Sequence, residues 1–466
     1  MLYIELDKKR RRSYTNQIYR QLRAKILDGE IAEGDRLPSS RALAQELGVA
    51  RNTVYSAYDM LASDGYVQSV SGSGVFIKSG VRAARPPERI SDSYITSLAA
   101  DELPKDVINF DSGIPALDLF PRGKWNRMLT RAFNEAPVSA LGYDYPEGRP
   151  ELRRTLSSYL YKVRGITCDP EQIIVTSGTK QGLSLVAKCL LNKDSKVWLE
   201  DPANDNVRRI FSYHTDNLIP VEVDAEGIQT DNFPAGSIPT LIFVTPSHQF
   251  PMGGILSAQR RQTLAEYARK TGCYIVEDDY DSEFRYNGEP VNSLLELNHE
   301  TVIYVGTFSK VMYPSLRLGY LVLPWPLVEQ CRQWKRLSDH HTNSICQLAL
   351  MRFIESGDLE RHIMCMKKVY RRRRACLISL LRKYFCDRLK IYGDPSGMHI
   401  VAEVEGAVFS DNLVRSIIAE GVNIVPVEKH ALNKGGHKNQ IIMGYANLTP
   451  AEMEQGIIRI KTAIGI

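Results

Sequence analysis

Two hydroxyls, an amine and a guanidinium follow one short apolar run in the sequence. Residues 302–305 read Val-Ile-Tyr-Val, and the residues after them include Thr307, Ser309, Lys310 and Arg317. A lysine amine can condense with an aldehyde, while hydroxyl and guanidinium groups are good phosphate ligands. An aldehyde and a phosphate on one small ring describe pyridoxal 5'-phosphate (PLP), so the pattern predicts a site for that cofactor.

A second run supplies partners for the ring of this cofactor. Residues 277–280 read Glu-Asp-Asp-Tyr at the end of another apolar run. Alternation along a strand places Asp278 and Tyr280 on the same face. A carboxylate that faces the pyridine nitrogen keeps it protonated and makes the ring a better electron sink. We therefore expect Asp278 at the ring nitrogen and Tyr280 at the 3'-oxygen.

The cofactor phosphate can draw on a further segment. Gly178, Thr179 and Lys180 stand between the apolar run 173–176 and a predicted helix. Backbone N–H groups at the start of a helix form a ready anion site. Each of these signals is weak by itself, because a lysine after a strand is usually a surface residue and acidic strand ends are common. Their order and spacing together indicate a PLP site.

The first eighty residues predict a different kind of domain. Apolar residues at helical spacing indicate helices over 15–28 and 51–64, with a shorter one between Ser39, a natural N-cap, and Gly48. Residues 66–77 read as two strands joined by a glycine-containing turn. Three short helices followed by such a hairpin are typical of a winged helix-turn-helix, which binds double-stranded DNA.

Specific side chains in this domain are placed to contact DNA. Arg51, Asn52 and Thr53 begin the third helix, where a recognition helix presents its side chains to base edges. We expect contacts to phosphates and to the duplex backbone from a second set: Ser39, Ser40, Arg41, Ser71 and Gly72. The alternative is that the helices and the hairpin form a protein-contact module.

The rest of the chain alternates between strands and helices. Strands are predicted over 172–176, 197–199, 241–245, 274–277 and 302–305, with helices over 181–191 and 258–271 between some of them. This alternation indicates an α/β fold with a mainly parallel central sheet. Between the two halves the periodicity is lost. We therefore predict a winged helix-turn-helix over 1–78, a linker over 79–106, and a cofactor- and effector-binding domain over 107–466.

Composition restricts the class of protein and the compartment that we expect for it. Its 466 residues carry a net charge of +5 and no apolar run of the roughly 20 residues that cross a bilayer. The N-terminus lacks the apolar core of a secretion signal, and the eight cysteines form no C-x-x-C pair, so we expect a cytoplasmic protein without disulfides. A basic run over 8–12 is either a phosphate-contacting arm or a solvated segment, and a second over 367–374 is expected on a solvated helix face.

The order of these motifs resembles the fold-type I aminotransferases, and more specifically the MocR group of GntR-type bacterial regulators. In the DNA-binding half the resemblance rests on Leu-Pro-Ser-Ser-Arg-Ala-Leu-Ala-Gln-Glu-Leu-Gly-Val-Ala-Arg-Asn-Thr-Val at 37–54. In the other half it rests on Glu-Asp-Pro at 200–202, Thr-Pro-Ser-His-Gln-Phe-Pro at 245–251 and Gly-Thr-Phe-Ser-Lys at 306–310. The matches extend over essentially the whole chain.

This resemblance implies a set of cofactor contacts and a partner. The contacts are a Schiff base with PLP, a carboxylate at the ring nitrogen, a phenol near the 3'-oxygen and a guanidinium near the phosphate, which fall on Lys310, Asp278, Tyr280 and Arg317. The partner is a second copy of the chain in a head-to-tail homodimer, where Tyr143 or Tyr145 reaches the site of the other subunit.

Two positions depart from the family pattern. Asn204 stands where the family has an aromatic ring on the pyridine, and Asn447 stands where it has the arginine that grips a substrate or effector carboxylate. A neutral amide binds a carboxylate more weakly than a bidentate guanidinium does. Arg208 and Arg209 remain candidates to bind an effector carboxylate instead. The histidines show no metal-binding spacing, so no metal is expected.

These observations favour a PLP-binding transcriptional regulator with a double-stranded DNA operator and a small-molecule effector. The effector is either PLP itself, as in the PdxR-like subgroup, or an amino-acid-related compound, and the regulated genes are those of vitamin B6 or amino-acid metabolism. An effector must bind two conformations differently to change DNA occupancy. Two alternatives stay open: a working PLP-dependent aminotransferase with an accessory DNA-binding domain, and a DNA-binding protein whose second domain holds no cofactor.

Overall fold

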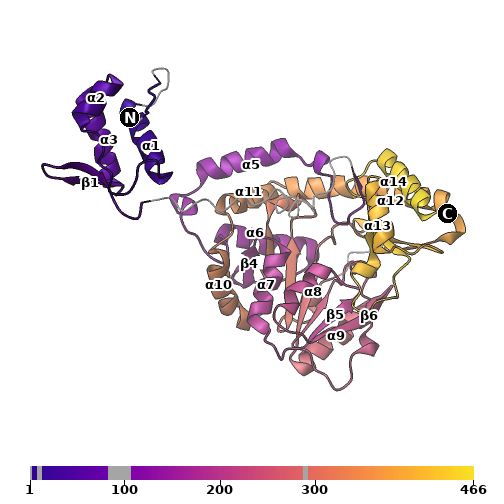
Figure 1. Cartoon of the computed structure of the whole chain (residues 1–466). Helices are drawn as coiled ribbons and strands as arrows, with labels where there is room; N and C mark the ends of the chain where they lie inside the picture. The colour runs from indigo at the N-terminus through magenta and orange to yellow at the C-terminus, as the bar shows by residue number, and fades with distance from the viewer. Residues whose placement is uncertain (1–2, 8–12, 82–106, 287–291, 466) are drawn as a thin grey trace. The chain divides into compact units, whose positions relative to one another are not determined.

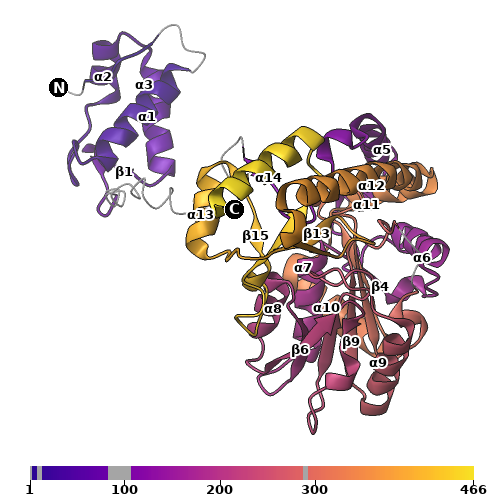
Figure 2. The same ribbon diagram turned by 90° about the vertical axis from the view of Figure 1, so that its right-hand side faces the viewer.

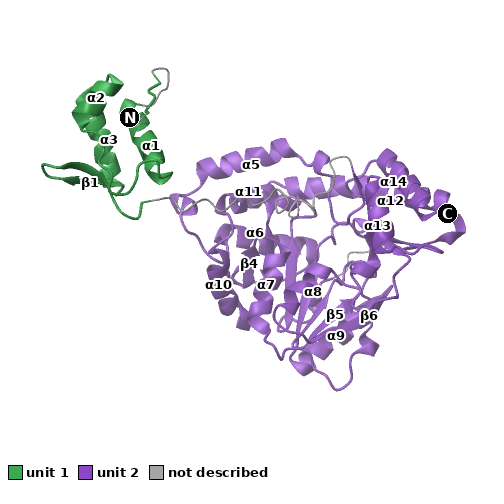
Figure 3. Ribbon diagram, in the orientation of Figure 1, with its two compact units in different colours: residues 1–102 green, residues 103–466 purple. Residues whose placement is uncertain are grey.

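The computed structural model describes residues 3–7, 13–81, 107–286 and 292–465. It divides the chain into two compact units, residues 1–102 and 103–466, which Figure 3 colours separately. The predicted linker over 79–106 and the basic run over 8–12 lie almost entirely outside the described residues.

The smaller unit consists of three helices and a hairpin. Its elements are α1 (Tyr14–Leu27), α2 (Ser40–Leu47), α3 (Arg51–Ser63), β1 (Val67–Val70) and β2 (Gly74–Ile77). The Ser39 hydroxyl accepts a hydrogen bond from the N–H of Ala42 and caps α2, which ends at Gly48 in the left-handed conformation. Almost fully buried apolar side chains from all three helices form the core: Ile18, Leu22, Ile26, Leu43, Val54, Ala57 and Leu61. This is the predicted winged helix-turn-helix arrangement.

An eight-stranded sheet forms the centre of the larger unit (Figure 1). In spatial order its strands are β4 (Ile173–Thr176), β11 (Gly319–Val322), β10 (Val302–Thr307), β9 (Tyr274–Asp279), β8 (Leu241–Val244), β5 (Val197–Asp201), β6 (Leu218–Asp224) and β7 (Gly227–Ile228). The five strands from β10 to β6 run parallel to one another, whereas β11 and β7 are antiparallel to their neighbours. The predicted α/β fold with a mainly parallel sheet is therefore confirmed.

Helices cover both faces of this sheet (Figure 2). One face packs against α7 (Thr179–Leu190), α8 (Asp205–Ser212) and α10 (Trp325–Asp339), and the other against α6 (Pro150–Arg164), α9 (Ala258–Thr271) and α11 (Ser344–Glu355). In β10, Ile303 and Val305 belong to the first core and Val302 and Tyr304 to the second. Burial on both sides explains why these strands read as nearly continuous apolar runs.

The C-terminal part of the unit is built around a second, antiparallel sheet. Its strands, in spatial order, are β12 (Leu389–Tyr392), β13 (His399–Val404), β16 (Gln440–Gly444) and β15 (Val425–Pro426). The remaining helices are α5 (Arg122–Glu135), α12 (Asp358–Phe385), α13 (Asp411–Ala419) and α14 (Pro450–Ile464). A short parallel pair, β3 (Ile108–Asn109) with β14 (Val422–Asn423), ties the start of the unit to this C-terminal part.

The environment of the basic run over 367–374 differs from the one that the sequence predicts. It lies on α12, but it is not simply a solvated face. Arg371 donates to the carbonyl oxygen of Tyr286 at 3.2 Å, Arg374 pairs with the Asp394 carboxylate at 2.8 Å, and Arg373 donates to the carbonyl oxygen of Ala446. The run thus fastens α12 to its neighbours. Within the described ranges, no helix is long and apolar enough to cross a bilayer.

Candidate functional site

Lys310 lies three residues after the end of β10, and protein groups surround its amine. Its Nζ atom donates to the carbonyl oxygen of Gly113 at 2.9 Å. Removal from water lowers the pKa of the amine below its ordinary value, while the nearby carboxyls of Asp281, Asp111 and Asp278 act in the opposite direction. A lowered pKa leaves more of the amine neutral, which is the form that attacks an aldehyde.

Asp278 is a buried carboxyl group near the C-terminal end of β9. Burial raises its pKa to about 7, the carboxyl of Asp279 adds to the rise, and the amine of Lys310 opposes it. Its Oδ1 atom has no hydrogen-bond partner among the described residues. A buried acceptor without a donor is costly, so the site is suited to a ligand that brings one. A protonated pyridine nitrogen is such a donor.

Groups suited to a phosphate meet at the start of α7. Gly178 precedes the helix with φ of 93°, and Thr179 and Lys180 are its first two residues. The Nη2 atom of Arg317 donates to the carbonyl oxygen of Ser177 at 2.6 Å, which brings the guanidinium to this helix start. The Thr307 and Ser309 hydroxyls are hydrogen-bonded to each other at 3.1 Å. The structure thus joins Arg317 to the helix start and keeps the two hydroxyls together.

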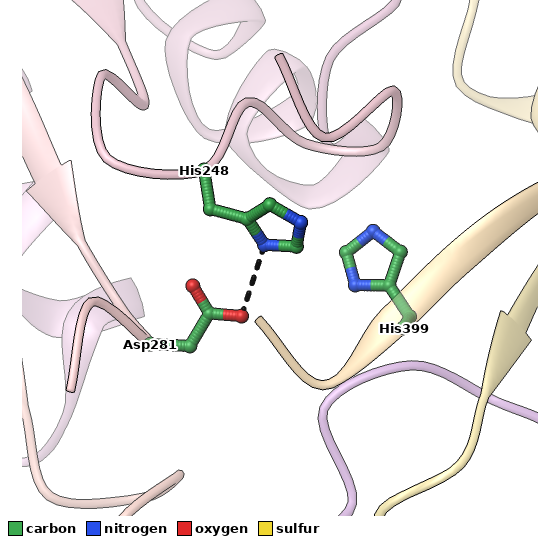
Figure 4. A group of neighbouring side chains, drawn as sticks. All are labelled: His248, Asp281 and His399. Atoms are coloured by element: carbon green, nitrogen blue, oxygen red, sulfur yellow. Dashed lines mark hydrogen bonds and ion pairs between the residues drawn. The ribbon is translucent and has the colours of Figure 1, made fainter. Parts of the chain in front are cut away.

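Tyr280 belongs to a group that the sequence spacing does not reveal. Its hydroxyl donates to the carbonyl oxygen of His248 at 2.9 Å and lies 3.1 Å from the Nδ1 atom of that residue. The same Nδ1 atom is 3.1 Å from Oδ2 of Asp281, and the ring of His399 lies beside it with centroids 4.8 Å apart (Figure 4). His248, Asp281 and His399 are all buried, and their ligand atoms lie within 4.8 Å of one another. They come from three distant segments, which is why spacing gave no sign of the group.

The four predicted effector and ring-packing residues are engaged by protein groups. The Asn204 side chain caps α8 by accepting from the N–H of Asn206 at 3.0 Å. Both predicted effector arginines pair with Asp205: Arg209 at 2.7 Å and Arg208 in an even closer contact. The Asn447 amide donates to the carbonyl oxygen of Asn109 at 3.0 Å, and its own Oδ1 atom is buried without a partner in the described part of the chain.

The predicted DNA contacts gather on the smaller unit. Arg51 and Asn52 are exposed at the start of α3, where Thr53 is half-buried, and the Nε atom of Arg51 donates to the Ser40 hydroxyl at 3.3 Å. That bond links the start of α3 to the start of α2. The remaining predicted contacts are exposed as well, although the Ser39 hydroxyl also caps α2: Ser39, Arg41, Ser71 and Gly72.

Comparison with known families assigns both units. Residues 14–77 match the family described as bacterial regulatory proteins, gntR family, and residues 105–460 match aminotransferase class I and II. The probable rhizopine catabolism regulatory protein MocR of Rhizobium meliloti is 33% identical over 459 residues, covering 96% of this chain and 93% of the relative. The chain belongs to the MocR group of GntR-type transcriptional regulators.

Other relatives of this MocR-group chain include regulators and enzymes. The pyridoxine biosynthesis regulator PdxR of Corynebacterium glutamicum is 30% identical, with 97% of this chain and 96% of the relative covered. The larger unit is similar to a solved kynurenine aminotransferase of Pyrococcus horikoshii that was crystallised with PMP, with 27% identity, a TM-score of 0.72, and coverage of 81% of this chain and 95% of the enzyme. The α-aminoadipate aminotransferase LysN of Thermus thermophilus, complexed with a phosphopyridoxyl-leucine, gives 27% identity and a TM-score of 0.71 with the same coverage.

Proposed function

We propose that the larger unit binds PLP through Lys310 and that PLP is itself the effector of this transcriptional regulator. The observation that carries the first part is the buried Oδ1 atom of Asp278, which lacks a donor among the described residues of a site that also holds the amine of Lys310, whose pKa burial lowers. A pyridine nitrogen and an aldehyde on one ring would satisfy both groups at once. Regulation of vitamin B6 genes is the function that such an effector would serve.

Different residues of the chain bind the three functional groups of the cofactor, which are its aldehyde, its ring nitrogen and its phosphate. Lys310 provides the amine for the aldehyde, and Asp278 keeps the ring nitrogen protonated. Gly178, the first backbone N–H groups of α7 and Arg317 receive the phosphate dianion. When bound, PLP supplies an electron-withdrawing ring, and the residues around it decide whether that ring is used for chemistry or only for recognition.

The groups that would bind an amino-acid carboxylate favour PLP over an amino acid as effector. Position 447 offers an amide in place of a guanidinium, and Arg208 and Arg209 are both paired with Asp205. An arginine that is already paired with one carboxylate gains less from a second, and an ion pair of the largely exposed Arg209 with an effector is weak. An amino-acid-related effector stays the rival within the same class.

A second copy of the chain is the proposed partner of the larger unit. Large apolar side chains are exposed along the segment from α5 to residue 145, and two of them are almost fully exposed, Val138 at 86% and Tyr143 at 87%. An apolar surface of this kind is typical of a subunit interface. This supports a homodimer in which Tyr143 or Tyr145 contacts the partner, as the family resemblance implies.

The test measures DNA binding by the purified full-length protein. The probe is the DNA upstream of its own gene, with PLP and a panel of amino acids added separately. We expect PLP alone to change the affinity for that DNA, and a sodium borohydride adduct of PLP to map to Lys310 by peptide mass spectrometry. An adduct on another residue would contradict the cofactor assignment, and a response only to one amino acid would contradict PLP as effector.

A working aminotransferase is the second candidate, because the larger unit matches that family over residues 105–460. Steady turnover of an amino acid with a keto-acid acceptor would support it. The neutral amide at position 447 leads us to expect no such turnover.

A further inference from the structure

The group formed by Tyr280, His248 and Asp281 has a defined hydrogen-bond direction. The Nδ1 atom of His248 is 3.1 Å from Oδ2 of Asp281 and 3.1 Å from the hydroxyl oxygen of Tyr280. A carboxylate oxygen only accepts hydrogen bonds, so Nδ1 carries the hydrogen. The Nε2 atom of His248 is buried without a partner among the described residues, which agrees with a lone pair there, because a buried N–H without an acceptor costs more.

The hydrogen on Nδ1 of His248 also determines the direction in which the O–H group of Tyr280 donates. Its hydroxyl donates to the carbonyl oxygen of His248 at 2.9 Å. Because Nδ1–H of His248 faces a lone pair of the phenol oxygen, the phenol hydrogen has to point elsewhere. The phenol hydrogen can be donated to the carbonyl oxygen of His248 or to an oxygen of a bound cofactor. Tyr280 is therefore held as a donor.

The imidazole of His248 is held in one position by its neighbours. Gly397 lies so close that a Cβ atom there would be 2.0 Å from Cε1 of His248 and 2.7 Å from Oδ2 of Asp281. The ring of His399 also lies beside that of His248, with centroids 4.8 Å apart, and the Nε2 atom of His399 is 3.0 Å from the carbonyl oxygen of Pro251. Burial lowers the pKa of His399 well below its ordinary value, so that ring stays neutral and adds no positive charge beside His248.

We propose that Asp281 and His248 are positioning residues for Tyr280: Asp281 selects the Nδ1–H form of His248, and His248 directs the phenol hydrogen toward the ring oxygen of the cofactor. The inference rests on the proposed binding of PLP. The other titratable groups that act on Tyr280, Lys310 and His399 are Asp278 and Asp279 on β9, Glu200 on β5, Asp111 after β3, Lys310 after β10, His399 on β13 and His430.

The first test is a pH titration of the yellow colour of the full-length protein with PLP. A phenol O–H that donates to the ring oxygen of PLP stabilises negative charge on that oxygen. The nitrogen of Lys310, once joined to PLP, then releases its proton at a lower pH. Because Tyr280→Phe removes this hydrogen bond, we expect the midpoint pH of the colour change to be about one unit higher than in the wild type. His248→Phe should raise it in the same direction.

Two further variants separate positioning from a merely structural role. If His248 acts through Tyr280, the double variant Tyr280→Phe/His248→Phe has the midpoint of Tyr280→Phe alone. His248→Asn, which keeps a donor near the place of Nδ1, should return most of the wild-type midpoint. The control is His214→Asn, at a half-buried histidine on another segment. An unchanged midpoint in His248→Phe, or full addition of the two shifts, would overturn the proposal.

The second test needs no cofactor and so separates this proposal from the proposed function. In the cofactor-free protein labelled with ¹⁵N-histidine, the signal of His248, identified by its loss in His248→Asn, should report the Nδ1–H form, and Asp281→Asn should abolish that preference. An Nε2–H form in the wild type would overturn the proposal. One zinc ion retained per chain, and lost in His248→Asn and His399→Asn, would also overturn it by assigning the group to a metal. If the wild type never turns yellow with PLP, the proposed function fails while this measurement still decides the tautomer.

Discussion

The guanidinium of Arg317 is bound to the carbonyl oxygen of Ser177 at 2.6 Å, directly beside Gly178. Two strands of the sheet bring this contact about, because β11 follows Arg317 and pairs with β4, which ends just before Ser177. A Cβ atom on Gly178 would lie 2.9 Å from Nη2 of Arg317. The absence of a side chain at this position therefore leaves the guanidinium and the helix start free to face a phosphate together.

Gly178→Ala should weaken PLP binding. The added methyl group pushes on the Arg317 guanidinium, and φ of 93° is unfavourable for alanine. We expect a loss of roughly tenfold to a hundredfold in PLP affinity, measured by absorbance titration. Gly236→Ala is the matched control, because Gly236 also has a positive φ but no atom near the place of a Cβ. An equal loss in both variants would mean that backbone strain alone is responsible.

Asp278→Asn should have opposite effects on the protein with and without PLP. The pKa of the buried carboxyl is about 7, whereas an unfolded aspartate titrates near about 4. The native state therefore holds a proton between these values that the unfolded chain releases, and stability falls as the pH rises through this window. Without PLP, we expect the variant to be more stable than wild type at pH 8 by about 1–3 kcal/mol, and equal at pH 4.

The same variant loses the carboxylate that we propose to face the ring nitrogen of PLP. With PLP added, its cofactor affinity should fall roughly tenfold to a hundredfold, the size of one charge-assisted hydrogen bond. Asp216→Asn, at an exposed position, serves as the control in both measurements. Unchanged PLP affinity in Asp278→Asn would remove Asp278 from the cofactor site.

Asp111→Asn should shift the pH dependence of PLP addition to lower values. The Asp111 carboxyl raises the pKa of the Lys310 amine, which burial lowers. Removing that negative charge lets the pKa fall further, so the neutral amine appears at lower pH. We expect the rate of colour formation to reach half of its maximum about one pH unit lower than in wild type. Stopped-flow absorbance measures this, with Asp118→Asn, at an exposed position of the same segment, as control. A shift to higher pH would contradict the assignment of Lys310.

Arg51→Ala should reduce operator affinity without changing PLP binding. Arg51 is exposed at the start of α3, which is the recognition helix of a winged helix-turn-helix. Loss of one guanidinium contact to a base or a phosphate costs about 1–3 kcal/mol, or roughly tenfold to a hundredfold in affinity. Fluorescence anisotropy with upstream DNA at fixed salt measures it, and Arg122→Ala on α5 is the charge-matched control. Equal losses in the two variants would indicate a general charge effect.

Asn447→Arg should give the protein a response to amino acids. The change places a guanidinium where the family has one, next to the carbonyl oxygen of Asn109 that the amide now binds. We expect amino acids to alter the absorbance of the PLP-loaded variant but not of the wild type. Asn447→Gln, which adds length without charge, should behave like the wild type. A wild-type response equal to that of the variant would show that carboxylate recognition lies elsewhere.

Local pattern was sufficient for the smaller unit and for the centre of the main sheet, but not for the second sheet of the larger unit. The helices of the smaller unit and four of the five parallel strands, all except β6, were predictable because their apolar spacing and caps, such as Ser39 and Gly48, act within a few residues. β11 was not predicted, because four residues next to the cofactor motif carry no separate signal. The contacts of Arg373 and Arg374 on α12 were also missed, since a charge run looks the same whether it is solvated or bound to distant backbone oxygens.

The site was predictable only where its residues are close in sequence. Lys310, Thr307 and Ser309 form one motif, and Asp278 and Tyr280 form another. The link between Tyr280, His248 and His399 depends on three segments that meet only in the folded chain, so spacing could not disclose it. The pairing of Arg208 and Arg209 with Asp205 was missed although it is local, because the three residues lie three and four positions apart on α8.

The hydrogen bond from Lys310 to Gly113 connects the amine of the site to the first described residues of the larger unit. From Gly113 the chain runs back through β3, which is fixed to β14, to residue 107, where the described part of the larger unit begins. An amine that condenses with an aldehyde loses hydrogens, so the hydrogen bond from Lys310 to the Gly113 carbonyl oxygen would weaken. Such a change would act on a segment that the pairing of β3 with β14 holds against the C-terminal part of the unit.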